Sequence, residues 1–328
     1  MQSLTRQLVV ILATGTLSVA ACTSSTTTSG RKLVIAEGTQ PIAAPIYIAN
    51  AKGYFKEEGV DVELVSFPTG KLCLDALIGG KADFATAAET PIMHASFTNQ
   101  PVRIVATFHR ATENTYIVAR KDRGISAPVD LRGKTVGVPF GTNAEYALAA
   151  FLSKNGLKPT DLNLINLSPP EMIGPISKGD VAAVAAWEPH AARSQKALDD
   201  NAVRFSFAQV YEETYNLVSS PTMAKDNMDS IVKVLRALNR AVAFIPANRA
   251  ESIEIVAKRI GMETTELDRV WPVYHFGLDL RTSLLDLLTS EGKWAVERGH
   301  QNGKVPDMRN LISTSALRAV RPESVELP

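Results

Sequence analysis

The chain has 328 residues with 35 basic and 34 acidic side chains, which gives a formal charge of +1. A charge this close to zero excludes a general electrostatic attraction to nucleic acid or to an anionic membrane surface, so local groups must recognise any charged ligand. The sequence has two cysteines, Cys22 and Cys73, and no disulfide framework is possible if Cys22 is modified.

The first 22 residues have the pattern of an export signal. Arg6 precedes an apolar run from Leu8 to Ala13 that is too short to span a bilayer, and small residues then lead to Cys22. A small-residue cleavage site that ends in cysteine resembles the bacterial lipobox, so we expect residues 1–22 to be a lipoprotein signal peptide and Cys22 to be acylated. An ordinary signal peptide with an incidental cysteine is the alternative. The polar tract over residues 23–30 predicts a flexible tether.

About 300 residues follow, a length that suggests two domains. Strand and helix signals alternate from Arg31 onward, and this alternation predicts an α/β fold in which helices cover parallel strands. Cys73 occupies an apolar position of a helical stretch, so we expect a small buried hydrophobe rather than a reactive thiol. The first lobe is expected to have strands at 33–36, 61–67, 84–87 and 102–108, and helices at 42–52, 71–78 and 91–97.

A loop rich in Gly, Pro and Asp over residues 121–133 introduces a second lobe. There we expect strands at 135–138, 164–167 and 181–187 and a helix around 144–152, and residues 215–218 form a further extended stretch. Residues 226–257 and 283–298 are helical by periodicity. This helical tail predicts a cap that returns to the first lobe.

Motifs of common catalytic sites are missing from the sequence. There is no GxSxG, HExxH, GxGxxG, P-loop or CxxC pair, and the five histidines are not spaced as metal ligands. We therefore expect a protein that is not an enzyme and that has no cofactor and no metal.

The strongest local site is the turn at Gly141, Thr142 and Asn143, which joins a strand to a helix. Free N–H groups at a helix start, together with the helix dipole, suit a carboxylate, sulfonate or phosphate. Thr142 and Glu145 also have the spacing of a capping box, which would satisfy some of these donors internally. We expect a ligand site that includes the cap, because two of the first N–H groups stay free.

Further candidates follow other strands, where open α/β sheets hold their ligands. Glu89 and Glu188 each come between a buried strand and a helix, and Trp187 can stack on a ligand. A half-buried core tryptophan and a helix-start acid are the alternatives for Trp187 and Glu188. The remaining candidates lie after the first strand or on the return strand, namely Thr39, Gln40, Tyr215 and Asn216.

The chain resembles the solute-binding proteins of ABC importers for nitrate, sulfonates and taurine, a group that includes binders of thiamine-pyrimidine precursors. Four stretches carry the resemblance, which we expect to cover nearly the whole mature chain: Ala49 to Val62, Ala76 to Phe84, Leu131 to Gly137 and Lys178 to Pro189. It implies a two-lobed periplasmic-binding-protein-like fold of type II with crossover strands near 116–119 and 215–219. Lobe I would comprise residues 31–117 plus 219–328, and lobe II residues 118–218.

The resemblance also implies a ligand held between the lobes by the candidate residues named above. The protein would be a monomer outside the cytoplasm, anchored through Cys22, with an ABC permease and its ATPase as partners. A carboxylate at Glu89 disfavours nitrate, so an aminosulfonate such as taurine or an aminopyrimidine fits better. Two alternatives remain: an enzyme resembling thiamine-pyrimidine synthases, which would need a cysteine cluster that Cys73 alone does not supply, and a ligand-sensing receptor domain without transport.

Overall fold

The computed structural model describes residues 31–98 and 100–328. The predicted signal peptide, the tether and Cys22 lie outside the described residues. No helix in the described part of the chain is long and apolar enough to cross a membrane.

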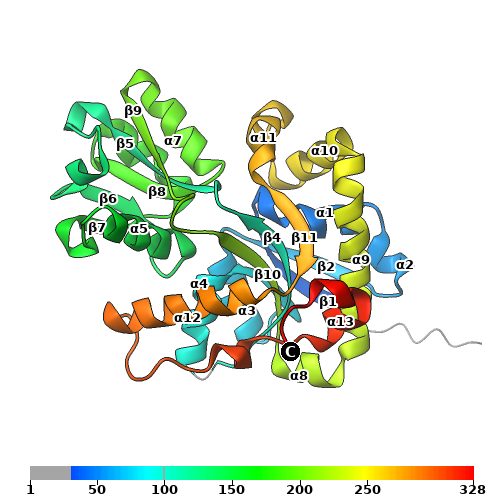
Figure 1. Cartoon of the computed structure of the whole chain (residues 1–328). Helices are drawn as coiled ribbons and strands as arrows, with labels where there is room; N and C mark the ends of the chain where they lie inside the picture. Colours follow the sequence, from blue (N-terminus) through cyan, green and yellow to red (C-terminus); the bar gives the residue numbers. More distant parts are fainter. Residues whose placement is uncertain (1–30, 99) are drawn as a thin grey trace, which may run out of the picture. The chain divides into compact units, whose positions relative to one another are not determined.

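Two β-sheets form the framework of the unit made by residues 31–328 (Figure 1). One sheet has six strands in the order β11-β4-β10-β3-β1-β2, and the other has five in the order β7-β6-β8-β5-β9. The strands are β1 (Leu33–Gly38), β2 (Val62–Phe67), β3 (Phe84–Ala88), β4 (Arg103–Ala111), β5 (Thr115–Arg120), β6 (Thr135–Val138), β7 (Asn163–Asn166), β8 (Ala183–Trp187), β9 (Ala202–Ser206), β10 (Glu213–Ser219) and β11 (His275–Asp279).

Helices pack against both sheets, as the predicted α/β class requires. They are α1 (Ala44–Ala51), α2 (Tyr54–Glu57), α3 (Gly70–Ile78), α4 (Glu89–Phe97), α5 (Asn143–Lys154), α6 (Ile173–Lys178), α7 (His190–Leu198), α8 (Pro221–Asp226), α9 (Met228–Ala247), α10 (Arg249–Ile260), α11 (Thr264–Val270), α12 (Thr282–Glu297) and α13 (Ser315–Val320). Helix α9 packs against α1 and α13, and α12 packs against α4, so the helical tail returns to the first lobe as predicted.

Each sheet has a parallel core extended by antiparallel strands. In the first, β1, β2 and β3 are parallel, and β10 pairs antiparallel with both β3 and β4. In the second, β6, β7 and β8 are parallel, and β5 pairs antiparallel with β8 and β9.

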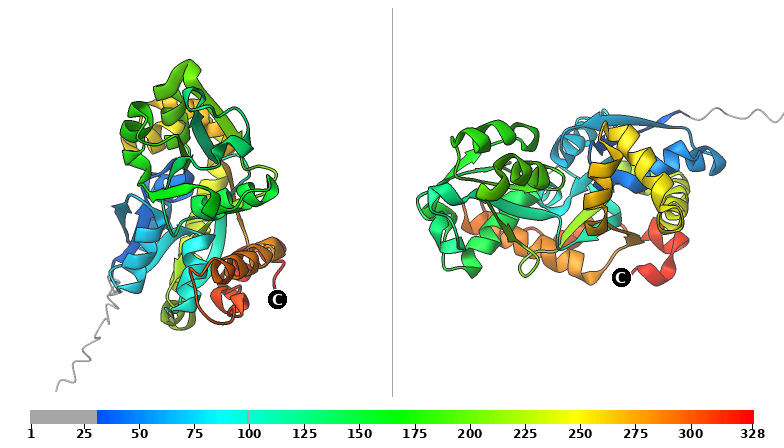
Figure 2. Two further views of the ribbon diagram at one scale, coloured as in Figure 1. Left: turned by 90° about the vertical axis from the view of Figure 1, so that its left-hand side faces the viewer. Right: turned by 90° about the horizontal axis from the view of Figure 1, so that it is seen from above.

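The chain passes between the sheets twice, from β4 to β5 and from β9 back to β10. Strand β5 belongs entirely to the five-stranded sheet and β10 entirely to the six-stranded sheet. The predicted lobe boundaries at 117/118 and 218/219 therefore fall inside strands, while the observed crossings are the segments 112–114 and 207–212. Figure 2 shows these connections from two further directions.

Some elements differ from the sequence-based prediction. The predicted helix over 226–257 is divided, because α9 ends at Ala247 just after Pro246, which lacks the N–H of a regular helical residue, and α10 begins at Arg249. Strands β9 and β11 and helix α7 were not predicted. Both strands lie at a sheet edge and have only five residues, so their alternation is too short to be a strong signal.

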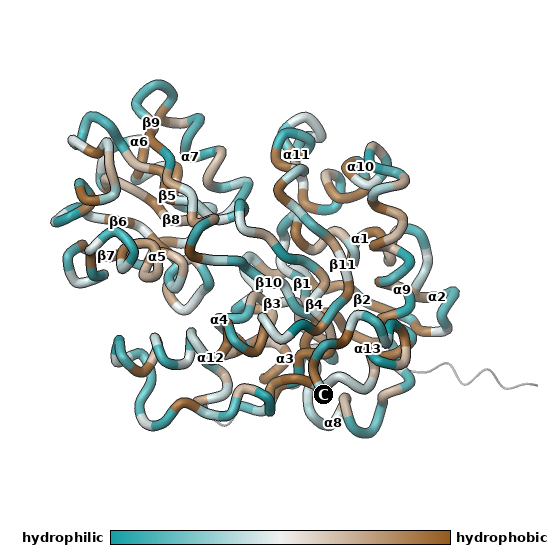
Figure 3. The backbone as a smooth tube through the Cα atoms, viewed as in Figure 1, coloured by the Kyte–Doolittle hydropathy of each residue, from teal (hydrophilic) through white to brown (hydrophobic). Residues whose placement is uncertain are grey.

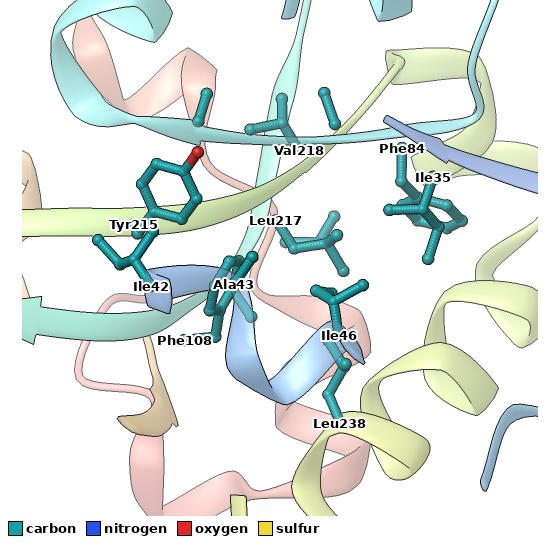
Figure 4. Close-up of a cluster of buried hydrophobic side chains, with 14 of the residues drawn as sticks. Ile35, Ile42, Ala43, Ile46, Phe84, Phe108, Tyr215, Leu217, Val218 and Leu238 are labelled. Carbon is teal, nitrogen blue, oxygen red and sulfur yellow. The ribbon is translucent and has the colours of Figure 1, made fainter. Parts of the chain in front are cut away.

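The apolar core of the first lobe forms where α1 and α9 meet the six-stranded sheet. Figure 4 shows Ile46 and Leu238 from these helices together with Phe84 and Leu217 from β3 and β10, and all four side chains are fully buried. In Figure 3 hydrophobic and hydrophilic stretches alternate along α9, as expected for a helix with one packed face. Cys73 is also fully buried, which confirms the predicted small hydrophobe.

We expect Leu238→Ala to lower the free energy of unfolding by about 2–5 kcal/mol, because it leaves a cavity between α9 and its neighbours. Urea titration followed by circular dichroism measures the change. The matched control is Val129→Ala at a side chain that is 56% exposed, where we expect a change within about 0.5 kcal/mol. A loss below about 1 kcal/mol for Leu238→Ala would contradict the packing described here.

Candidate functional site

A cavity, here called the central cavity, lies where the two lobes and the first crossing meet. Its empty space is about 360 Å³, part of it open to solvent, and the centre of a water molecule can occupy about 20 Å³. Its lining residues are Gln40, Ile42, Thr69, Gly70, Lys71, Ala88, Pro91, Asn114, Thr142, Asn143, Trp187, Glu213 and Tyr215.

The parallel strands explain why these residues converge. Gln40 follows β1, Thr69 follows β2 and Ala88 ends β3, while in the other lobe Thr142 follows β6 and Trp187 ends β8. Carboxyl ends of parallel strands lie along one edge of a sheet, so the two sheets present these edges to a common space. The central cavity is therefore built from corresponding positions in both lobes.

Three residues that line the central cavity each have a buried polar atom with no hydrogen-bond partner in the described structure. These atoms are Trp187 Nε1, Tyr215 Oη and Asn114 Oδ1. The residues are only 4%, 4% and 2% exposed. A buried polar group left without a partner costs about 1–3 kcal/mol, so three such groups around one cavity indicate a site for a polar ligand.

The carboxylate of Glu213 orders the groups around these atoms. It accepts hydrogen bonds from Asn114 Nδ2 at 2.6 Å, Asn143 Nδ2 at 3.0 Å and Thr115 Oγ1 at 3.1 Å. Because the Asn114 amide nitrogen is engaged by Glu213, its carbonyl oxygen is the atom left free. Glu213 lies on the return strand β10, so it links that strand to the first crossing and to the start of α5.

The predicted capping box at the start of α5 does not form. Thr142 Oγ1 donates to the Pro139 carbonyl at 2.6 Å, and Glu145 accepts from the Gly141 N–H at 2.7 Å. Neither side chain caps the first turn of α5, so its first amide groups are not satisfied in this way. The N-terminus of α5, with Thr142 and Asn143, borders the central cavity.

The candidates from the sequence divide into two groups. The central cavity brings together Gln40, Thr142, Asn143, Trp187 and Tyr215.

The other candidates do not line this cavity. Thr39 is exposed and its hydroxyl donates to the Phe67 carbonyl at 3.3 Å. Gly141 lines a neighbouring cavity instead. Asn216 is buried, and its Oδ1 accepts a hydrogen bond from Thr107 Oγ1 at 2.7 Å. It does not line the central cavity because alternate residues of β10 point to opposite faces and its neighbour Tyr215 lines the cavity.

Both predicted carboxylates are occupied by the protein itself. Glu188 accepts from Arg204 and from the Ala192 N–H in the first turn of α7, which matches the alternative of a helix-start acid. Glu89 is fully buried and accepts from the Tyr211 hydroxyl and from Thr214 N and Oγ1, both at 2.9 Å.

The sequence did not single out Asn114, Glu213 or Lys71. Glu213 lies two residues before Tyr215 and therefore on the same face of β10. The alternation of side chains along β10 is thus a signal that can identify Glu213 as a site residue. Asn114 and Lys71 have no comparable local signal, since their roles depend on the crossing and on the start of α3.

Glu89 belongs to a buried acidic pair with Glu291 of α12. Glu291 accepts from Thr90 Oγ1, and its other carboxylate oxygen has no partner. Burial raises the pKa of Glu89 to about 7, and the charge of Glu213 acts in the same direction. Burial, together with the charge of Glu89, raises the pKa of Glu291 well above its usual value. The folded protein therefore keeps protons on this pair at pH values where the unfolded chain has released them.

It follows that the free energy of unfolding contributed by the pair falls as pH rises from about 4.5 towards 7 and beyond. Glu291→Gln carries an amide in place of the protonated acid, so we expect a smaller loss of stability between pH 5 and pH 8 than in the wild type. Urea unfolding at both pH values measures this, with Glu254→Gln at an exposed position of α10 as control. An identical pH dependence for Glu291→Gln and the wild type would contradict a proton on the pair.

Comparisons with known proteins agree with this architecture. The family model described as NMT1/THI5 like matches residues 40–252. The taurine-binding periplasmic protein of Escherichia coli K12 is 30% identical over 151 residues, which are 46% of this chain and 47% of that protein. The chain thus aligns with about half the length of this curated relative.

Solved structures show the same fold. The alkanesulfonate-binding protein SsuA of Xanthomonas axonopodis pv. citri, bound to MOPS, has a TM-score of 0.75 at 20% identity, covering 86% of this chain and 98% of that one. The periplasmic nitrate-binding protein NrtA of Synechocystis PCC 6803 has a TM-score of 0.72 at 15% identity, covering 90% and 89%. The predicted fold and resemblance are thereby confirmed: the chain belongs to the NMT1/THI5-like family and has the two-lobed fold of periplasmic binding proteins.

Proposed function

We propose that this protein is the substrate-binding component of an ABC importer, held outside the cytoplasm by lipid on Cys22, and that it delivers a small organosulfonate such as taurine to a membrane permease. The observation that carries the proposal is the set of three buried, unpartnered polar atoms around the central cavity. The taurine-binding relative and the alkanesulfonate-binding structure support the choice of ligand class.

The polarity of the three atoms suits a zwitterionic molecule. Trp187 Nε1 and Tyr215 Oη can donate to sulfonate oxygens, and the start of α5 adds backbone N–H groups and a favourable dipole. Asn114 Oδ1 can accept from an ammonium group, with the Glu213 carboxylate close by. Nitrate has no hydrogen-bond donor for Asn114 Oδ1, and the negative charge of Glu213 disfavours a purely anionic ligand. The sequence analysis had assigned this effect to Glu89.

Binding between the lobes also gives a signal for delivery. Gln40 and Tyr215 come from the six-stranded lobe, whereas Asn143 and Trp187 come from the five-stranded lobe. A ligand that contacts both sets binds a closed arrangement better than an open one, so it shifts the population towards the closed form. We place the hinge at the two crossings, and the closed form is the one that the permease would recognise.

Trp187→Phe keeps an aromatic ring but removes the Nε1 donor. Because a hydrogen bond to a charged group contributes about 1.5–3 kcal/mol, we expect taurine to bind roughly 10-fold to 100-fold more weakly. Isothermal titration calorimetry measures the affinity. Trp271→Phe, at a buried tryptophan that does not line the central cavity, is the matched control and should bind as the wild type does.

Equal affinity of Trp187→Phe and the wild type would contradict the assigned contact. The same titration with nitrate and with an aminopyrimidine separates the ligand classes, and tight binding of the aminopyrimidine without taurine binding would favour the thiamine-precursor alternative. If the protein binds taurine but a strain that lacks the protein still takes up taurine normally, the receptor alternative would be favoured.

The lipid anchor has its own test, because Cys22 and Cys73 are the two cysteines of the chain. Expressed in a bacterial host, the wild-type protein should partition into the detergent phase of Triton X-114, whereas Cys22→Ser should remain in the aqueous phase. Cys73→Ser, at the buried thiol, is the control and should partition as the wild type does. Aqueous partitioning of the wild type would contradict acylation.

A further inference from the structure

His109 is a buried histidine that the proposed function leaves without a role. It belongs to β4, it is 1% exposed, and neither of its ring nitrogens has a hydrogen-bond partner in the described structure. Its Nε2 atom lies 3.6 Å from Oε1 of Glu213, the carboxylate that orders the central cavity. This distance is too long for a hydrogen bond, so the two groups are neighbours that are not yet joined.

A separate cavity, here called the crossing cavity, has His109 in its wall. The centre of a water molecule can occupy about 260 Å³ of this space. Thr112 from the first crossing and Glu212 from the second crossing also line it. Glu213 lines the central cavity and His109 does not. The pair of His109 and Glu213 therefore lies between a space that holds water and the proposed ligand site, so a proton can reach the pair without passing the ligand.

Aromatic rings fix the position of the imidazole. Strand β4 lies between β10 and β11 (Figure 1), and the ring centroids of Tyr274 and Phe276 are 5.7 Å and 5.6 Å from that of His109. Burial raises the pKa of Tyr274 well above its usual value, so this neighbour carries no charge at neutral pH. Burial likewise lowers the pKa of His109, although the charge of Glu213 acts in the opposite direction.

The other charged and titratable groups near His109 line the crossing cavity: Arg110, Glu212, His275, Asp279 and Arg281. Arg110 pairs with Asp279 at 2.6 Å and lies 3.8 Å from Glu212, and Arg281 also pairs with Asp279 at 3.0 Å. His275 is exposed, and its charge and that of Arg110 oppose protonation of His109. Since arginines match Asp279 and Glu212, Glu213 is the carboxylate that can stabilise a charged His109 ring.

The charge of a ligand decides whether Glu213 needs that help. Its carboxylate accepts from Asn114, Thr115 and Asn143, as an ionised group does. An ammonium group beside Asn114 Oδ1 balances this negative charge. A sulfonate without an ammonium group instead places a second negative charge in the same cavity, and two negative charges favour the uptake of a proton nearby. A protonated imidazole can donate from Nε2 to Glu213 Oε1.

We propose that His109 takes up a proton when the central cavity receives a sulfonate that lacks an ammonium group, and that His109 thereby sets which ligand charges the site accepts. The inference rests on the proposed function and adds a specificity residue to it. His109 acts through Glu213 and does not touch the ligand, so it is a positioning residue. Taurine brings its own positive charge and binds without proton uptake.

Two ligands of similar size separate these cases: taurine, and propane-1-sulfonate, which has a methyl group in place of the ammonium group. Isothermal titration calorimetry of the wild-type protein at pH 7, in buffers with different ionisation enthalpies, counts the protons taken up on binding. We expect net uptake, to a limit of one proton per site, with propane-1-sulfonate and none with taurine.

The same titrations at pH 6 and pH 8 give the second readout. A complex that holds more protons than the free protein loses affinity as the pH rises, so we expect the Kd of propane-1-sulfonate to increase at least about tenfold from pH 6 to pH 8. The Kd of taurine, which keeps its ammonium group over this range, should change by less than about twofold.

His109→Gln assigns the proton to its residue. The amide can still donate to Glu213 but cannot take up a proton, so the variant should show neither proton uptake nor the pH dependence with propane-1-sulfonate. His275→Gln, at the exposed histidine of the crossing cavity, is the matched control and should retain both. Thermal unfolding checks that each variant folds, and the wild-type titrations test the inference without any variant.

Four results would overturn the inference alone. Propane-1-sulfonate binds without proton uptake and equally at both pH values, it fails to bind at pH 6 although taurine binds, taurine takes up as many protons as propane-1-sulfonate, or the uptake persists in folded His109→Gln. If neither sulfonate binds at any pH, the proposed function itself fails and the inference fails with it.

Discussion

The buried carboxylate of Glu213 is the group on which the central cavity depends. A carboxylate removed from water is costly unless hydrogen bonds compensate it, and here the donors are Asn114 on the first crossing, Thr115 at the start of β5 and Asn143 at the start of α5. One side chain on the return strand thereby links the first crossing to the starts of β5 and α5. It also decides which Asn114 atom remains free for a ligand.

The α/β topology provides the rest of the arrangement. Parallel strands in both lobes end at the central cavity, and the antiparallel strands β5 and β10 carry the crossings to the same place. Trp187, Tyr215 and Asn114, each with a buried polar atom that has no partner, then line one cavity from different elements. A ligand that satisfies all of them joins the lobes, which links local hydrogen bonding to the closure on which transport would depend.

The sequence predicted those parts that follow from local patterns. The parallel strands, the helices between them and the turn at Gly141 to Asn143 have clear periodicity and turn residues. The loops after strands β1 and β6 and the last residue of β8 do supply lining residues. Glu89 and Glu188 also follow strands, yet their side chains bind the protein itself. Glu89 binds Tyr211, which is distant in sequence, and Glu188 binds Arg204, which lies on the edge strand β9 that was not predicted. Such partners depend on tertiary packing, so no local pattern reveals whether a strand-end acid faces the ligand or the protein.

The most direct measurement of the central claim is a two-dimensional nitrogen–proton NMR spectrum of the indole groups, since the chain has three tryptophans. Addition of taurine should shift the Nε1–H signal of Trp187, assigned by its loss in Trp187→Phe, and leave that of Trp271 in place. An unchanged Trp187 signal at saturating taurine, or an equal shift at Trp271, would contradict ligand capture between the lobes.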